Sequence, residues 1–220
     1  AMVTKIKDNE IDNVAELLKG FKPQKYKPSK RLETPGKVKT AGVLSLQDIH
    51  FGKEGNETID LDFEETIKDL VSRATSAHHL EKIYYVVGGD LINMDTWSGT
   101  TTSGTPLDNC KTATEAYMQA FSAIQWSINY IKQFCDELQV IYIPGNHDRL
   151  SSFHLAHGLS KCFDDPNILW DVVYLERKVF VYGDNFFAFE HGDVNTKNSL
   201  LLYSMEYPKE WGKTSFRTLY

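Results

Sequence analysis

The sequence predicts an α/β fold in which short buried strands alternate with longer amphipathic helices. Apolar runs such as residues 83–87 (Ile-Tyr-Tyr-Val-Val) have the length and composition of buried strands. Stretches with helical spacing of apolar residues, such as residues 63–80, separate these runs. Near the end of the chain, two apolar arms flank Gly183-Asp184-Asn185, a pattern typical of a β-hairpin. Alternating strands and helices favour an α/β sheet architecture, and the hairpin adds an antiparallel part.

Each element is expected from its local pattern, taken in chain order. The longest expected helix has an apolar face through Met118, Phe121, Ile124, Ile128 and Ile131. The expected helices are residues 5–20, 63–80, 113–138, 151–163 and 200–205. The expected strands are residues 43–46, 83–87, 140–143, 179–182, 186–189 and 216–220.

The chain divides into an N-terminal segment, residues 1–40, and one domain, residues 41–220. Residues 21–40 contain three prolines and seven basic residues against a single acidic one, Glu33. We interpret residues 21–40 as a solvated tether, and a contact with a phosphate backbone is the alternative. Residues 1–40 carry ten basic and five acidic residues (+5), and residues 41–220 carry fourteen and twenty-five (−11).

This charge distribution and the composition exclude several classes of protein. An acidic body is not typical of a protein that reads DNA sequence, but it suits one whose carboxylates bind cations. With 220 residues and 41% hydrophobic residues, the chain can bury a substantial core. No run approaches 18 apolar residues and no secretory signal is visible, so we expect no membrane span. The three cysteines are expected to be reduced thiols in a cytoplasmic protein.

Four expected strands end in side chains that bind metals. In open α/β sheets, ligands bind beyond the carboxyl ends of the strands, so these four ends can converge on one site. Imidazole and carboxylate groups together suit divalent Mn, Fe, Zn or Ni. The side chains are Asp48 and His50, Asp90, the run Asn146, His147 and Asp148, and His191.

Local geometry supports a shared site. Asp48 and His50 lie two residues apart on a segment expected to be extended, so both would point to the same side. Asp90 follows two glycines, which allow a tight turn and a close approach of the backbone, and its carboxylate could bridge two ions. Asn146 would add a neutral oxygen ligand.

These residues resemble the motifs of the calcineurin-like metallophosphoesterase superfamily. The chain has a D-x-H motif at residues 48–50, a G-D motif at 89–90, a G-N-H-D motif at 145–148, and His191, in that order. The resemblance covers residues 41–220. It implies a sandwich of two mixed β-sheets flanked by helices, and hydrolysis of phosphoesters with two divalent ions, of which Mn is favoured.

The resemblance also implies a role for each residue. Asp48 and His50 would bind the first metal, Asp90 would bridge both, and Asn146 and His191 would bind the second. The two ions would activate a water molecule and neutralise charge on the phosphoryl oxygens.

The remaining residues of the motif would act on the substrate. His147 would contact the phosphate and protonate the leaving oxygen, and Asp148 would orient the His147 imidazole. Arg149, directly after the motif, would form either a surface salt bridge or a phosphate contact. Asn93 would either hold the turn at Asp90 or face the site. Trp97 is expected to pack in the core, and stacking on a base is the alternative.

One motif of the superfamily is missing. Its members end with a G-H-x-H motif that supplies one ligand to each metal, but none of the seven histidines follows His191. We expect that this polypeptide stops just before that motif, at residues 216–220, and that water fills the two ligand positions.

Three hypotheses for function follow from the resemblance. The first is a phosphodiesterase whose substrates include DNA or RNA, as in the SbcD-like repair nucleases and their phage relatives. The G-N-H-D ending, and the absence of an arginine after Gly89-Asp90, favour it over the protein phosphatases. The second is a phosphomonoesterase acting on a nucleotide, metabolite or phosphoprotein. The third is a non-catalytic binding module or an inactive truncated fragment.

Overall fold

The structure is a computed structural model that describes residues 32, 39–194 and 196–220. The expected helix at residues 5–20 and most of the basic segment lie outside these residues. The division of the chain at residue 40 therefore stays a prediction.

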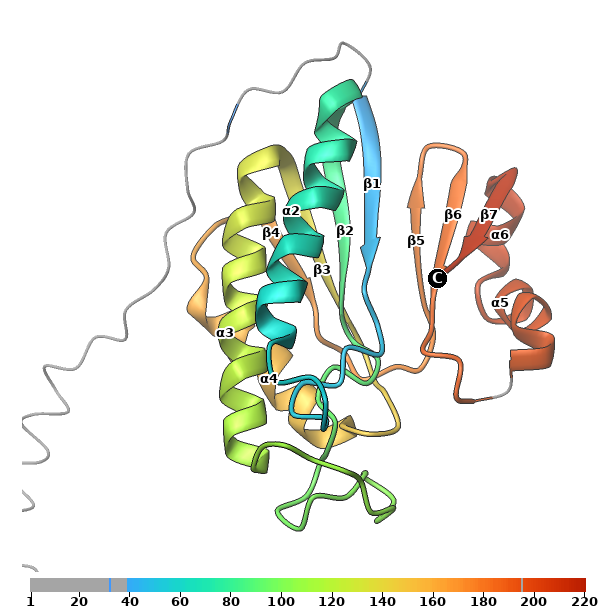
Figure 1. The fold of residues 1–220 in the computed structure, drawn as a ribbon. Helices are drawn as coiled ribbons and strands as arrows, with labels where there is room; N and C mark the ends of the chain where they lie inside the picture. Colours follow the sequence, from blue (N-terminus) through green and yellow to red (C-terminus); the bar gives the residue numbers. More distant parts are fainter. Residues whose placement is uncertain (1–31, 33–38, 195) are drawn as a thin grey trace, which may run out of the picture.

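The first sheet has four parallel strands in the order β1-β2-β3-β4. Its helices α2, α3 and α4 cover one face of the sheet (Figure 1). A large apolar core fills the space between this face and the helices, with Ile67, Val71, Ile128 and Leu155 fully buried in it. The elements are β1 (Lys39–Ser45), α2 (Ile59–Ala77), β2 (His79–Gly88), α3 (Ala113–Ile131), β3 (Cys135–Ile143), α4 (Arg149–Cys162) and β4 (Ile168–Asp171).

The second sheet has three strands and carries its own helices. Strands β5 and β6 form the antiparallel hairpin that the sequence predicts, and Gly183 provides the left-handed residue of its turn (φ 55°). Strand β7 pairs with β6 in parallel. The elements are β5 (Lys178–Tyr182), β6 (Asn185–Phe189), α5 (Ser199–Glu206), α6 (Pro208–Lys213) and β7 (Phe216–Leu219).

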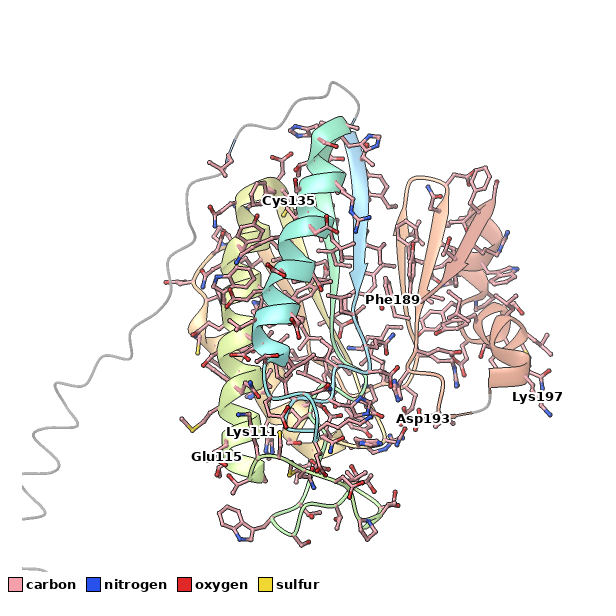
Figure 2. The ribbon with its side chains drawn as sticks, in the orientation of Figure 1. Lys111, Glu115, Cys135, Phe189, Asp193 and Lys197 are labelled. Carbon is pink, nitrogen blue, oxygen red and sulfur yellow. The ribbon has the colours of Figure 1, made fainter. Side chains whose placement is uncertain are left out.

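The two sheets face each other across a second apolar core. Phe189 lies between them (Figure 2) and packs with Tyr84, Val86, Ile141 and Ile143 of the first sheet. Helices α5 and α6 cover the outer face of the second sheet, where Tyr203 and Trp211 pack against Phe186 (Figure 1). The layers therefore follow the order helices, sheet, sheet, helices, which confirms the α/β class.

Several expected elements differ from the structure. The first sheet is wholly parallel among the described residues, not mixed. The helix expected over residues 113–138 ends at Ile131, because the residues from Cys135 onward pair with β2 as strand β3. Met118 is exposed, and small residues such as Ala120 occupy the buried face of α3 instead. Strand β4 and helix α6 were not expected from the sequence.

Candidate metal centre

The expected ligands meet at one edge of the first sheet. Asp48, Asp90, the turn at residues 145–148 and His191 follow β1, β2, β3 and β6 respectively. The structure forms two groups in which the donor atoms lie within 4.8 Å of one another. The groups that could hold a metal ion are Asp48 with Asp90 and His191, and His50 with Asp90 and His147.

The Asp90 carboxylate belongs to both groups. It is only 3% exposed, and its Oδ2 atom lies 3.3 Å from Nε2 of His191, 3.7 Å from Nε2 of His50 and 3.8 Å from Nε2 of His147. Burial alone would raise the pKa of Asp90, but hydrogen bonds from His191 and from the His147 backbone amide keep that pKa below its usual range. Asp90 is therefore held as an anion at the centre of three imidazoles.

Two of these imidazoles have Nδ1 bonded to a carbonyl oxygen and Nε2 facing Asp90. The Nδ1 atom of His50 donates to the carbonyl oxygen of Asp48 (2.9 Å), and Nδ1 of His147 donates to the carbonyl oxygen of Asn93 (2.9 Å). Burial lowers the pKa of His50, which favours its neutral form. A neutral ring with its proton on Nδ1 has a lone pair on Nε2. Metal-binding histidines commonly donate their other nitrogen to a carbonyl oxygen in this way, which leaves Nε2 to face a cation beside the carboxylate.

His191 belongs to the group with Asp48 and Asp90. Its Nε2 atom is within hydrogen-bonding distance of Asp90, and this interaction raises the pKa of His191 against the effect of burial. Its buried Nδ1 atom has no hydrogen-bond partner among the described residues. His191 forms a group of possible metal ligands with Asp48 and Asp90, and Nε2 is the nitrogen that faces the Asp90 carboxylate.

The backbone is strained at three of the five expected ligands. Among the described residues, the only non-glycine residues with positive φ are Asp48 (58°), His50 (56°) and Asp90 (57°). The expectation that Asp48 and His50 lie on an extended segment is therefore wrong. The reason is that the Asp48 and His50 amides donate to the carbonyls of Gly89 (2.8 Å) and Asp90 (3.0 Å), which bends both loops together. Left-handed Asp and His residues are uncommon and concentrate at functional sites.

Two glycines allow the strand ends to approach closely. A Cβ atom on Gly145 would lie 2.1 Å from the Asp90 backbone nitrogen, and one on Gly88 would lie 2.0 Å from the Ile143 carbonyl oxygen. Asp90 Oδ1 also accepts a hydrogen bond from the His147 amide (2.8 Å). Asn146 lies between Gly145 and His147 in the chain, which both contact Asp90, so its backbone lies next to the cluster. Its role as an oxygen ligand stays a prediction.

Asp148 does not orient the His147 ring. Its fully buried carboxylate accepts the Ile92 amide through Oδ2 (2.8 Å), and Oδ1 has no partner among the described residues. Burial raises the pKa of Asp148 to about 7. The carbonyl of Asn93 orients the ring instead, because Asp148 turns inward at the start of α4.

Two further expected residues have structural roles. The side-chain nitrogen of Asn93 donates to the Asp108 carbonyl (3.2 Å) and to Asn109 Oδ1 (2.8 Å), so Asn93 holds the loop and does not face the site. Arg149 donates to Glu176 (2.5 Å) and to Asp193 (2.8 Å), so its guanidinium forms ion pairs, which is the first of its two expected roles.

The sequence reasoning missed the residues that brace the site. Asp193 lies beyond the carboxyl ends of the strands (Figure 2), and its ion pair with Arg149 ties the His191 loop to α4. Asp95 accepts the amides of Leu150 (3.1 Å) and Ser151 (2.7 Å) and so caps α4. The position of Asp193, two residues after His191, was the available signal. Trp97, expected in the core, is 83% exposed.

A cleft of about 250 Å³ opens beside the cluster. It lies between the end of β1 and the first turns of α2, and it gives a bound molecule space next to Asp48. Its lining combines apolar and polar side chains. The lining residues are Leu46, Gln47, Asp48, Ile49, Asn56, Ile59, Asp62, Phe63 and Thr66.

Comparisons with known proteins do not identify a relative of this chain. Searches against family models, curated proteins and solved structures gave no match. Within the part of the chain that the structure describes, no helix is both long and apolar enough to cross a membrane.

Proposed function

We propose that this protein is a metal-dependent phosphoesterase that hydrolyses phosphodiesters. The observation that carries the proposal is the Asp90 carboxylate, which is shared by two groups of metal-type donors. A carboxylate shared in this way is the arrangement that a two-metal site needs. The resemblance of the motifs to the calcineurin-like metallophosphoesterases, and the sandwich of two sheets between helices, support the same proposal.

The donor set fits two divalent ions, with Mn favoured. When bound, two such ions lower the pKa of a water molecule and neutralise the developing charge on the phosphoryl oxygens. Asp48 and His191 would hold one ion with Asp90, and His50 would hold the other with Asp90. This grouping differs from the resemblance, which pairs Asp48 with His50. Asn146 would contribute an amide oxygen.

His147 is positioned to move a proton. Its Nδ1 atom is fixed on the Asn93 carbonyl, so Nε2 is the atom that faces the cluster. In the protonated ring, Nε2–H can be donated to the leaving oxygen of the ester. In the neutral ring, the same atom lies within ligand distance of the group with His50 and Asp90.

The charge around the site supports a diester substrate. A phosphodiester carries one negative charge, whereas a phosphomonoester carries close to two at neutral pH. The nearby Arg149 is already neutralised by Glu176 and Asp193. Because that guanidinium is already paired, it offers little positive charge to a substrate. The monoanionic diester needs less positive charge than the dianionic monoester, so the site favours the diester.

The test is Mn²⁺-dependent hydrolysis of bis-p-nitrophenyl phosphate and of p-nitrophenyl phosphate. We expect faster turnover of the diester, and a loss of more than about 100-fold in Asp90→Asn, since even indirect partners of a metal are worth 10–100-fold. Asp136→Asn is the matched control, because Asp136 pairs with His79 at the other end of the first sheet. Full activity of Asp90→Asn would contradict the proposal.

A further inference from the structure

Trp97 is unusually exposed for its size. Its side chain is 83% exposed, more than any other large apolar side chain among the described residues. The other tryptophans, Trp126, Trp170 and Trp211, each contact another aromatic ring. An indole has 150–250 Å² of surface to bury, so a ring left in water is available to a ligand.

The loop that carries Trp97 is braced by hydrogen bonds. Asp95 accepts the amides of Leu150 and Ser151 at the start of α4, and Thr102 Oγ1 donates to the same carboxylate (2.7 Å). Within the loop, the amides of residues 95 and 101 bond to the carbonyls of residues 100 and 105 (both 2.9 Å). A ligand that stacks on Trp97 therefore does not have to order the loop first.

The loop lies on the catalytic side of the first sheet. Figure 1 shows the segment between β2 and α3 projecting beyond the carboxyl ends of the parallel strands. The carbonyl of Asn93 binds the His147 ring, and Asp95 docks on the helix that begins directly after Asp148. Two residues of chain span at most about 7 Å, so Trp97 lies close to this docking point.

The chemistry of the loop suits an uncharged, planar group. Residues 95–106 contain five threonines and two serines, whose hydroxyls both donate and accept hydrogen bonds. Residues 95–110 contain no lysine or arginine, so the loop offers no cation to a phosphate backbone. An aromatic ring flanked by hydroxyls is a platform for an unpaired base, and stacking of this kind tolerates any base.

We propose that Trp97 stacks against an unpaired nucleobase of a phosphodiester whose phosphate binds at the metal centre around Asp90. This inference rests on the proposed phosphodiesterase function and narrows its substrate to nucleotide diesters. The absence of cations on the loop, together with the charge of −11 on residues 41–220, limits the contact to one or two nucleotides rather than a long strand.

The kinetic test compares two diesters with the same leaving group. Thymidine 5′-(p-nitrophenyl phosphate) carries a base, and methyl p-nitrophenyl phosphate does not. In Trp97→Leu we expect the KM for the thymidine diester to rise roughly 5- to 150-fold, the range measured for base stacking, with kcat unchanged. The methyl diester should be unaffected, and Trp97→Phe should be intermediate. Met205→Ala, on α5 and 70% exposed, is the control.

A binding measurement separates this inference from the proposed function. Tryptophan fluorescence is titrated with a pentathymidylate phosphorothioate, and with its abasic analogue, in Mg²⁺. We expect quenching by the base-bearing probe in the wild type and none in Trp97→Leu. Equal quenching in both proteins, or an equal rise of KM for both diesters, would overturn the role of Trp97. Absence of hydrolysis of both diesters would overturn the proposed function instead, and the quenching would still decide whether Trp97 binds a base.

Discussion

Replacing Asp48 by glycine or by alanine distinguishes the cost of backbone strain at residue 48 from the effect of losing its carboxylate. Both substitutions remove the same carboxylate from an exposed residue whose φ is 58°. Alanine in the left-handed region costs about 1–2 kcal/mol, whereas glycine adopts it without that penalty. Glycine also loses about 0.5–1 kcal/mol through the greater freedom of its unfolded chain. Taken at the midpoint of each range, these two costs make Asp48→Gly about 0.75 kcal/mol more stable than Asp48→Ala.

The assay is urea unfolding in the presence of EDTA, so that ligand binding does not contribute. Glu65 is the matched control, because it is exposed in the middle of α2. There, alanine should be more stable than glycine by about 1 kcal/mol, the reverse order. If the alanine variant at position 48 were as stable as the glycine variant, the argument from backbone strain would be refuted.

Two other perturbations test the surroundings of the site. Burial raises the pKa of Asp148 to about 7, so the folded protein binds a proton there that the unfolded chain releases near pH 4. In EDTA, the free energy of unfolding of the wild type relative to Asp148→Asn should fall by about 1.4 kcal/mol per pH unit between pH 5 and 6 and level off above pH 7. Urea unfolding measures this free energy, and parallel curves of free energy against pH for the two proteins would contradict the prediction. Arg149→Met removes the ion pairs with Glu176 and Asp193 from a side chain that is 25% exposed, so we expect a loss of only about 1 kcal/mol of stability. The same change releases the His191 loop, so we expect calorimetry to show a roughly 10-fold loss of Mn²⁺ affinity. Arg149→Lys should restore part of that affinity, and unchanged binding in Arg149→Met would show that the ion pairs do not position His191.

The sequence predicted the strands that lead into the site better than the elements between them. Runs such as residues 83–87 are buried on both faces and are recognisable from composition alone. The end of α3 was misplaced because Phe134 and Leu138 continue the helical spacing from Ile131, although pairing with β2 makes this segment a strand. Strand β4 has only four residues, too few for a periodic pattern.

The residue types at the site were predictable, but their orientations were not. The two glycines before Asp90 indicated a tight turn, and the structure shows that Gly88 lies against neighbouring backbone. No comparable signal marks Asp48 as left-handed, because Asp is also common in ordinary turns. Likewise, the family resemblance implied that Asp148 orients the His147 ring, whereas the Asp148 carboxylate accepts the Ile92 amide from another loop.

The number of Mn²⁺ ions bound per chain tests the central claim most directly. Equilibrium dialysis against Mn²⁺, followed by metal analysis, measures it without requiring a substrate. Because Asp90 belongs to both donor groups, we predict two ions per chain in the wild type and loss of both in Asp90→Ala, with Asp136→Ala unchanged. Wild-type protein that binds no Mn²⁺, or Asp90→Ala protein that still binds two ions, would contradict the proposed two-metal site.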